Sequence, residues 1–405
     1  MTMTDNRQTE QWRDSLALAS RWLAEVAMIA TDTADPETNR FCYEFSSWKG
    51  VLREYDAGTR QWLAFGPHWH TSQAVTALLA AHRRLGDGRL LEAARRGADF
   101  LLRERISDPA DPDYGVLLAY EGYAPSARII EISGMLESLN GLFQFSAATG
   151  ETRYADAAIT TLDWIARRAF NPDEGLIVDT YEQKTRNVKA FARGKLVTQG
   201  RPLIEDAVFL TGYQRSEKPA FRAIFFALAD RLLRDEDPPG NWISYRPCNK
   251  QAGTLHPRQA YWWGRPMIAA WQASGESKYL DCAVRVAEWY RRAQRADGGL
   301  FRGTYTDFRT DSFGHATSGI LCASLLWRDL IVAGRGDAYR EPLQRALAYA
   351  RALQFIEPAD ANLKGAILEK VRMPDGTDRL PFVVRDLATI FYVQALAAAL
   401  EDGLI

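Results

Sequence analysis

Two acidic residues of this chain have surroundings that suit acid–base chemistry. Glu131 lies in RIIEISGML and Asp206 lies in RPLIEDAVFL, so that apolar residues flank both carboxyl groups. A carboxyl group in an apolar cleft has a raised pKa, which a general acid needs near neutral pH. An acid that only caps a helix would occupy the same kind of position. We predict that Asp206 and Glu131 are catalytic.

Residues that suit ligand binding stand at similar positions, just before or within the first turn of predicted helices. The chain has five histidines, and all but His82 fall in this set. Tryptophan rings stack on sugar faces, and the fork of an arginine matches a carboxylate in two hydrogen bonds. A histidine bonded to loop backbone is the alternative interpretation for each position. The predicted substrate-binding residues are His68, Trp69, His70, His256, Arg258, Trp262, Trp263 and His315.

Helical periodicity predicts the elements that must position these residues. The expected helices are 9–30, 69–85, 88–104, 131–148, 152–168, 202–214, 219–234, 258–274, 278–294, 315–334, 338–355 and 383–401. Five short polar turns, beginning with LGDGRLLEAA (85–94), recur roughly every sixty residues and join these helices in pairs. The first helix of a pair is rich in small and apolar residues and the second is amphipathic. We expect an inner, buried helix and an outer helix with one face in water.

The remaining connections are long and run from each outer helix to the next inner helix. They span 31–68, 105–130, 169–201, 235–257, 295–314 and 356–382. Loops of this size in a compact domain are usually functional, and several contain extended segments that predict short strands, as in DYGVLLAYEG, DEGLIVDTY, GNWISYRP and DGGLFRGTY. They must all lie at one end, with the N-termini of the inner helices. Those N-termini favour an anionic ligand there.

A ring closes if helix 9–30 pairs with helix 383–401. The fold class that we predict is therefore all-α, an (α/α)6 toroid with short strands in long loops on one face, in which residues 1–405 form a single catalytic domain. An open α-solenoid is the alternative, but its repeats are usually shorter and lack one-sided long loops.

Composition restricts the partners that we expect. Fifty basic and fifty-one acidic residues leave a net charge of −1, without a basic block that would follow nucleic acid. Neither a leader segment nor a long apolar run is evident, which favours a cytoplasmic protein without a membrane partner. Four scattered cysteines predict buried thiols rather than a zinc site. We expect no cofactor and no metal, an anionic oligosaccharide as partner, and a monomer or homodimer.

Four stretches resemble the unsaturated glucuronyl and unsaturated rhamnogalacturonyl hydrolases, which are six-hairpin enzymes. HPRQAYWWGRPMIAAWQASGESKYLDCAVRVAEWYRRAQRADGGL (256–300) resembles their Arg-Gly-Gln-Ala-Trp helix and the turn after it. DSFGHATSGILCASLL (311–326) resembles their Asp-Ser-Ser-Ala run. RPLIEDAVFL (201–210) resembles the segment with the catalytic aspartate, and RIIEISGML (128–136) resembles the His-Asp-Leu-Gly-Phe segment, with Ile130-Glu131 in place of His-Asp.

The resemblance implies hydration of the C4=C5 enol ether of an unsaturated uronic acid at a non-reducing end, after which the glycosidic bond breaks. Asp206 would protonate the vinyl carbon and then, as a carboxylate, activate water. Glu131 would position water or a hydroxyl, and Arg258 would hold the uronate. Trp69, Trp262 and Trp263 would stack on sugars, with His68, His70 and His256 as hydrogen-bond partners.

Other reactions on the same fold stay open. A glycosidase acting on a saturated sugar would use Glu131 and Asp206 as its carboxylate pair, with a separation that decides between retention and inversion. A sugar epimerase or isomerase, such as the N-acylglucosamine 2-epimerases, would use His256 and His315. A uronate lyase would need Tyr261 or His70 as base.

Overall fold

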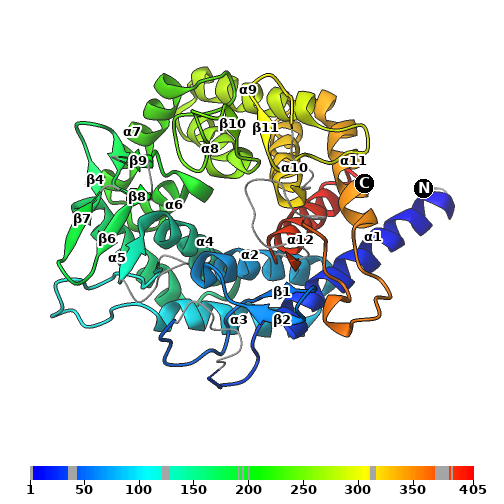
Figure 1. The fold of residues 1–405 in the computed structure, drawn as a ribbon, viewed down its shortest axis with the longest axis horizontal. Coiled ribbons are helices and arrows are strands. Elements are labelled where there is room, and N and C mark those ends of the chain that lie inside the picture. The colour runs from blue at the N-terminus through cyan, green and yellow to red at the C-terminus, as the bar shows by residue number, and fades with distance from the viewer. Residues whose placement is uncertain are drawn as a thin grey trace.

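Alternate helices of the chain line the inside and the outside of a ring (Figure 1). This computed structural model describes residues 3–34, 43–120, 128–189, 191–193, 196–198, 200–310, 316–369, 383–384 and 386–405. The inner helices are α2 (Pro67–Leu85), α4 (Ile132–Thr149), α6 (Val208–Ser216), α8 (Arg265–Ser274), α10 (Thr317–Val332) and α12 (Asp386–Glu401). The outer helices are α1 (Met3–Arg21), α3 (Gly88–Arg103), α5 (Thr152–Arg168), α7 (Pro219–Asp235), α9 (Ser277–Ala293) and α11 (Arg340–Ala352). The predicted (α/α)6 toroid is confirmed.

The two kinds of helix differ because their sequences do. In α12 nearly all side chains are buried, including both Asp386 and Gln394, since the helix is covered on all sides. In α3 the buried residues repeat every three or four positions, as in Leu90, Ala93 and Ala94, which gives one face for the ring and one for solvent.

The ring closes as expected, because α1 packs on α12. The Ser15 hydroxyl on α1 lies 2.7 Å from the Tyr392 hydroxyl on α12, and it also donates to Gln354 at 2.5 Å. These polar atoms are buried within a continuous apolar core that includes residues of both helices, such as Leu16 and Phe391. The first and last helices of the chain thus form the sixth hairpin.

The short turns use residues that stop one helix and start the next. In LGDGR, Gly86 takes a left-handed conformation with φ 69°, which ends α2 without a Cβ clash. Asp87 follows as N-cap and accepts a hydrogen bond from the backbone N–H of Arg89 at 3.0 Å. This local chemistry explains why the helix pairs could be read from the sequence.

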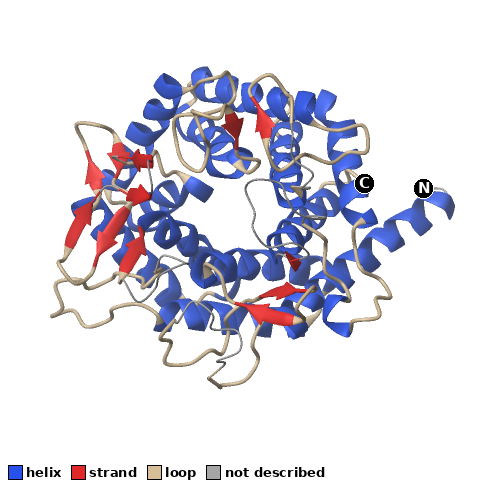
Figure 2. Ribbon diagram, in the orientation of Figure 1, coloured by secondary structure: helices blue, strands red, loops and turns tan. Residues whose placement is uncertain are grey.

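All described strands lie in the long connections, which join outer to inner helices at one end of the ring; Figure 2 shows these strands in red around the ring. They are β1 (Glu54–Asp56), β2 (Gln61–Leu63), β3 (Ile129–Glu131), β4 (Phe170–Asn171), β5 (Leu176–Ile177), β6 (Thr180–Glu182), β7 (Asn187–Lys189), β8 (Phe191–Arg193), β9 (Leu196–Thr198), β10 (Thr254–Leu255), β11 (Thr304–Tyr305) and β12 (Val383–Val384). Antiparallel sheets of order β12-β1-β2 and β3-β6-β7 tie neighbouring loops together, with Ile130 opposite Tyr181. We call this the long-loop end, and the opposite end the short-turn end.

The predicted strands in 173–181 and 297–305 are confirmed by β5, β6 and β11. The segment GNWISYRP instead forms turns, with one isolated bridge between Asp237 and Trp242. Tight turns there bring Trp242 into the core, where its indole N–H donates to the Leu232 carbonyl at 2.8 Å. Among the described helices, none is both long and apolar enough to cross a membrane.

Two inner helices start differently from the expectation. The predicted helix 202–214 begins with a 3₁₀ turn (Glu205–Ala207), and the predicted helix 258–274 begins with a π-helical turn (Ala260–Gly264). The wider π turn lets Tyr261, Trp262 and Trp263 all be buried although they are consecutive. Both irregular turns contribute side chains to the interior of the ring.

Candidate functional site

Asp206 has an unusual backbone conformation that directs its side chain into the ring. Its φ is 51° and that of Ala207 is also 51°, both in the left-handed region. Non-glycine residues in this region cost of order 1–3 kcal/mol each, and such strain clusters at functional sites. These two left-handed residues end the 3₁₀ turn before the regular helix α6 begins. The Asp206 carboxyl group therefore precedes α6.

The Asp206 carboxyl group accepts two hydrogen bonds on one oxygen. Gln73 Nε2 and the Tyr261 hydroxyl each donate to Oδ2 at 2.8 Å, and Gln73 Nε2 also donates to the Tyr261 hydroxyl at 2.8 Å. Gln394 of α12 holds Gln73 in turn, since its Nε2 donates to Gln73 Oε1 at 3.1 Å. Three inner helices or their starts therefore fix the position of one carboxylate.

Burial governs the electrostatics of this group. It raises the pKa of Asp206 above the ordinary value, and the positive charge of Arg265 and the hydrogen bonds from Gln73 and Tyr261 oppose this rise only in part. Burial, and next the Asp206 charge, raises the pKa of Tyr261 well above its ordinary value. Tyr261 is thus held as a neutral phenol that donates to Asp206, which suits a positioning role better than that of a lyase base.

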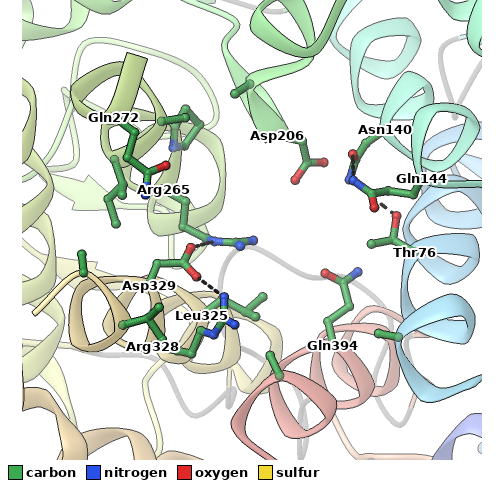
Figure 3. Close-up of a pocket in the computed structure, with 18 of the residues that line it drawn as sticks. Thr76, Asn140, Gln144, Asp206, Arg265, Gln272, Leu325, Arg328, Asp329 and Gln394 are labelled. Atoms are coloured by element: carbon green, nitrogen blue, oxygen red, sulfur yellow. Dashed lines mark hydrogen bonds and ion pairs between the residues drawn. The ribbon is translucent and has the colours of Figure 1, made fainter. Parts of the chain in front are cut away.

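Asp206 faces a cavity of about 470 Å³ inside the ring. Figure 3 shows Asp206 and Arg265 pointing into it from different walls, with Gln394 on a third. Asn140 and Gln144 of α4 add carboxamide groups. Its lining continues along the C-terminal halves of α2, α4, α8, α10 and α12, toward the short-turn end.

Two further buried acids, Glu137 and Glu205, lie close enough to Asp206 for its charge to raise their pKa values. Glu137 of α4 accepts a hydrogen bond from the Trp262 indole N–H at 2.6 Å, and burial raises its pKa to about 7. Burial, and next the charge of Glu137, raises the pKa of Glu205 well above its ordinary value. Arg201 lowers both pKa values less than burial raises them, and it is itself paired with Asp179 at 2.6 Å.

Four predicted binding residues meet at the long-loop end of the ring. The guanidinium carbon of Arg258 lies 5.9 Å from the Trp69 ring centre and 5.5 Å from that of Trp262. His256 also lies against Trp262, and their ring centres are 4.8 Å apart. We call Trp69, Arg258, Trp262 and His256 the aromatic platform. Trp69 stands four positions before Gln73 on α2, about 6 Å along the helix axis, so the Trp69 side of the platform lies one helical turn above a hydrogen-bond donor of Asp206.

Arg258 is fixed by polar groups behind it. Its Nη1 donates to the Ser318 hydroxyl at 3.4 Å and lies 4.0 Å from Glu369. Glu369 is fully buried, accepts hydrogen bonds from the Ser318 backbone and hydroxyl at 2.8 and 2.7 Å, and pairs with Arg302 at 3.4 Å. The platform therefore carries a positive charge of fixed position.

Glu131 lies at the long-loop end but away from Asp206. It forms the end of β3, 3.7 Å from Arg246, and its side chain is 31% exposed. Asn140, whose hydrogen bond lowers the pKa of Asp206, stands nine positions after Glu131, which places it roughly 13 Å further along the helix axis. This arrangement does not favour a glycosidase that uses Glu131 and Asp206 as a carboxylate pair.

Two further predicted residues are buried beside the platform: His68 lines a small pocket with Trp69 and Glu131, and the ring centre of Trp263 lies 6.0 Å from that of Trp262. His68 is buried between Phe45 and Phe100, with ring centres 5.6 and 5.2 Å away, and burial lowers its pKa to about 3. Trp263 is buried against Trp242 and Tyr245. These two side chains pack against the core and also neighbour the platform. His315 lies outside the described residues.

His70 belongs to a separate buried cluster. Its Nδ1 lies 2.9 Å from Asp386 and 3.8 Å from Glu54, and all three side chains are at most 1% exposed. Within the described part of the chain, they form the group whose donor atoms lie close enough to hold a metal ion. The direct contact of His70 with Asp386 uses those same atoms and links α2 to α12.

Sequence reasoning missed several of the residues around Asp206. Gln73, Glu137, Asn140 and Arg265 were not among the expected site residues because they do not stand at the starts of the predicted helices. A pattern in α4 could have revealed two of them: Glu137, Asn140 and Gln144 recur every three or four residues in an otherwise apolar run. Such a polar stripe on an inner helix predicts an interior site.

No protein-family model matches the sequence, and no curated protein matches it either. Solved structures do resemble the fold. An unsaturated glucuronyl hydrolase specific for heparin has a TM-score of 0.70 at 15% identity, with 98% of each chain covered. Cellobiose 2-epimerase from Bacillus thermoamylovorans B4167 has a TM-score of 0.71 at 12% identity, with 98% of this chain and 100% of that chain covered.

A D-mannose isomerase is also similar, with a TM-score of 0.62 at 12% identity and 98% of each chain covered. At such low identity these neighbours establish the fold alone. They confirm the resemblance to the six-hairpin enzymes that the sequence predicts. Because the neighbours include both hydrolases and enzymes that rearrange sugars, the reaction must be argued from the residues of this chain.

Proposed function

We propose that this protein is a carbohydrate-active hydrolase that removes an unsaturated uronic acid from the non-reducing end of an oligosaccharide. The observation that carries the proposal is the state of Asp206. Its carboxyl group is strained into position, has a raised pKa and accepts a hydrogen bond from Gln73, which lies one helical turn from Trp69 of the aromatic platform. A group of this kind can donate a proton and then act as a base.

The proposed reaction uses Asp206 twice. The protonated carboxyl group gives its proton to C4 of the C4=C5 double bond, and a water molecule adds at C5 while the new carboxylate takes its proton. The resulting hemiketal opens to a ketone at C5, and the released anomeric centre loses the rest of the oligosaccharide as an alcohol. Gln73 and Tyr261 stabilise the carboxylate between the two proton transfers.

The aromatic platform supports recognition of an acidic sugar. Trp69 and Trp262 present ring faces for stacking, and Arg258 between them offers a charge for a carboxylate. Glu131 and Arg246 at the long-loop end are exposed enough to bind hydroxyl groups of the substrate.

The proposal is tested by following the ultraviolet absorbance of the double bond in unsaturated uronyl disaccharides. The wild-type protein should bleach it, and Asp206→Asn should lower the rate by at least about a thousandfold while circular dichroism stays unchanged. Asp113→Asn is a matched control, since Asp113 is also a buried acid that accepts a tyrosine hydroxyl, from Tyr181 at 2.6 Å. A constant absorbance across substrates of varied linkage would refute the proposal.

Sugar epimerisation is the second candidate, and the place of His256 favours it. This histidine lies against Trp262 at the edge of the platform, where it could move a proton beside a sugar carbonyl. On this alternative, solvent deuterium would enter the carbon next to the carbonyl of a reducing sugar. His256→Ala would abolish that exchange, whereas Asp206→Asn would only reduce it.

A further inference from the structure

The cavity below Asp206 has features of a binding site of its own. Its lining includes Arg83 near the end of α2, Arg328 near the end of α10, and Val332, whose side chain is 57% exposed at the end of α10. The cavity therefore opens at the short-turn end, away from the aromatic platform. Its volume of about 470 Å³ is within the range of small-molecule sites.

Arg265 directs a positive charge into this cavity. Its Nε donates to Asp329 at 2.8 Å, which fixes the direction of the guanidinium group. Within the described part of the chain, its two terminal nitrogens have no hydrogen-bond partner, and they point into the cavity (Figure 3). Asp329 is shared with Arg328, whose Nη1 lies 3.0 Å from it. Three arginines line the cavity against two aspartates, one of which is Asp206 with its raised pKa.

The rest of the described lining indicates what kind of ligand fits. Asn140, Gln144, Gln272 and Gln394 provide carboxamide groups that can both donate to and accept from hydroxyls. The described lining contains no aromatic ring, which disfavours a nucleobase or a stacked sugar face. An arginine fork surrounded by carboxamides matches a small molecule with one carboxylate and several hydroxyl groups.

We propose that the short-turn end of the ring holds a second binding site, in which Arg265 binds the carboxylate of a small polyhydroxylated acid. The ligand enters from the short-turn end and its hydroxyl groups bond to the carboxamides of α4, α8 and α12. This inference does not depend on the reaction that Asp206 performs, since it rests on the cavity and on Arg265.

Such a ligand would be coupled to Asp206. The charge of Arg265 lowers the pKa of Asp206, and a bound carboxylate would neutralise that charge. The pKa of Asp206 would then rise further. A small acid at the short-turn end could in this way alter the protonation of a group that serves the long-loop end.

The experiment is isothermal titration of the full chain with D-glucuronate, and with D-glucose as the uncharged probe of similar shape. Arg265→Gln should weaken glucuronate binding by at least about tenfold, because one charge-assisted contact is lost. Arg335→Gln, at an exposed arginine of a neighbouring short turn, should not. Glucose should bind at least about tenfold more weakly than glucuronate.

Arg258→Gln separates this site from the aromatic platform. If glucuronate binding survives in Arg258→Gln and is lost in Arg265→Gln, the second site is supported. The proposal is overturned if Arg265→Gln binds like the wild type, or if Arg258→Gln removes all binding. Ala269→Trp, which fills the cavity without changing its charge, must also abolish the Arg265-dependent binding, and this variant decides the question if Arg265→Gln does not fold.

Discussion

At the scale of single residues, Asp206 combines features that reduce stability with features that suit catalysis. A raised pKa means that the ionised carboxylate is less favourable in the folded chain than in the unfolded chain. The hydrogen bonds that Gln73 and Tyr261 donate to one carboxylate oxygen offset the cost of burying this charge only in part. If position 206 served packing alone, an uncharged amide would give a more stable protein than the carboxylate. The difference in the free energy of unfolding can be measured.

The first prediction concerns Asp206→Asn and stability. Above the folded-state pKa the ionised carboxylate lowers the free energy of unfolding, and this penalty disappears as the pH falls through that pKa toward the ordinary value of 3.8. The amide should therefore raise the free energy of unfolding at pH 7 by on the order of 1 kcal/mol, with a smaller gain in acid. Denaturant unfolding at several pH values measures this. A variant that is less stable than the wild type at pH 7 would contradict the assignment.

The second prediction concerns Tyr261→Phe and the pH profile. Removing the hydroxyl takes one donor from the Asp206 carboxylate, so the pKa of Asp206 rises further. If the protonated acid starts the reaction, the limb in which kcat/KM falls with rising pH should move to higher pH. Tyr392→Phe removes a buried hydroxyl near Ser15 instead and should leave the profile in place. An unshifted limb in Tyr261→Phe would show that this carboxyl group is not the one that titrates.

At the scale of elements, helix positions follow from local sequence, whereas the contacts of the site do not. The turns with Gly86 and Asp87 could be predicted because capping chemistry lies within a few residues. The 3₁₀ turn before α6 could not, since its left-handed residues are Asp206 and Ala207 rather than glycines. The surroundings of Asp206 depend on Gln73 and Tyr261, more than fifty residues away on either side, so neither partner is visible in the local sequence.

The third prediction tests the strained turn. Ala207 has φ 51°, and a Cβ in this conformation costs roughly 1–2 kcal/mol. Replacement by glycine removes this cost, but the greater conformational entropy of glycine in the unfolded chain offsets part of the gain. Ala207→Gly should leave stability unchanged or raise it by up to about 1 kcal/mol. Ala166→Gly in α5 should lower it by about 1 kcal/mol. Equal losses in both variants, measured by thermal unfolding, would mean that Ala207 is not strained.

At the scale of the whole molecule, the ring has two ends with different roles. The repeat of helix pairs predicts the ring and its long-loop end, and locates the aromatic platform there. The cavity at the short-turn end was not predicted, because most of its lining residues lie beyond the starts of the predicted helices. Glu137 was not predicted for a related reason: it lies within α4, whereas Glu131 stands at the start of that helix.

The fourth prediction concerns closure of the ring. Leu16 on α1 is fully buried in the core that α1 and α12 share, so Leu16→Ala should cost about 2–5 kcal/mol of the free energy of unfolding. Because the contact between α1 and α12 is part of one continuous core, circular dichroism and tryptophan fluorescence should report a single shifted unfolding transition. A separate early transition in this variant would indicate that α1 is only loosely attached to the ring.

The central claim, that Asp206 transfers a proton during hydration of an unsaturated uronic acid, has one direct test. The wild-type protein is incubated with an unsaturated uronyl disaccharide in heavy water, and the released uronic acid is examined by NMR. Hydration predicts one deuterium at C4 of the uronic acid and an unlabelled partner sugar, with no product from Asp206→Asn. Deuterium beside the carbonyl of the reducing sugar, with the double bond intact, would contradict the claim and favour epimerisation.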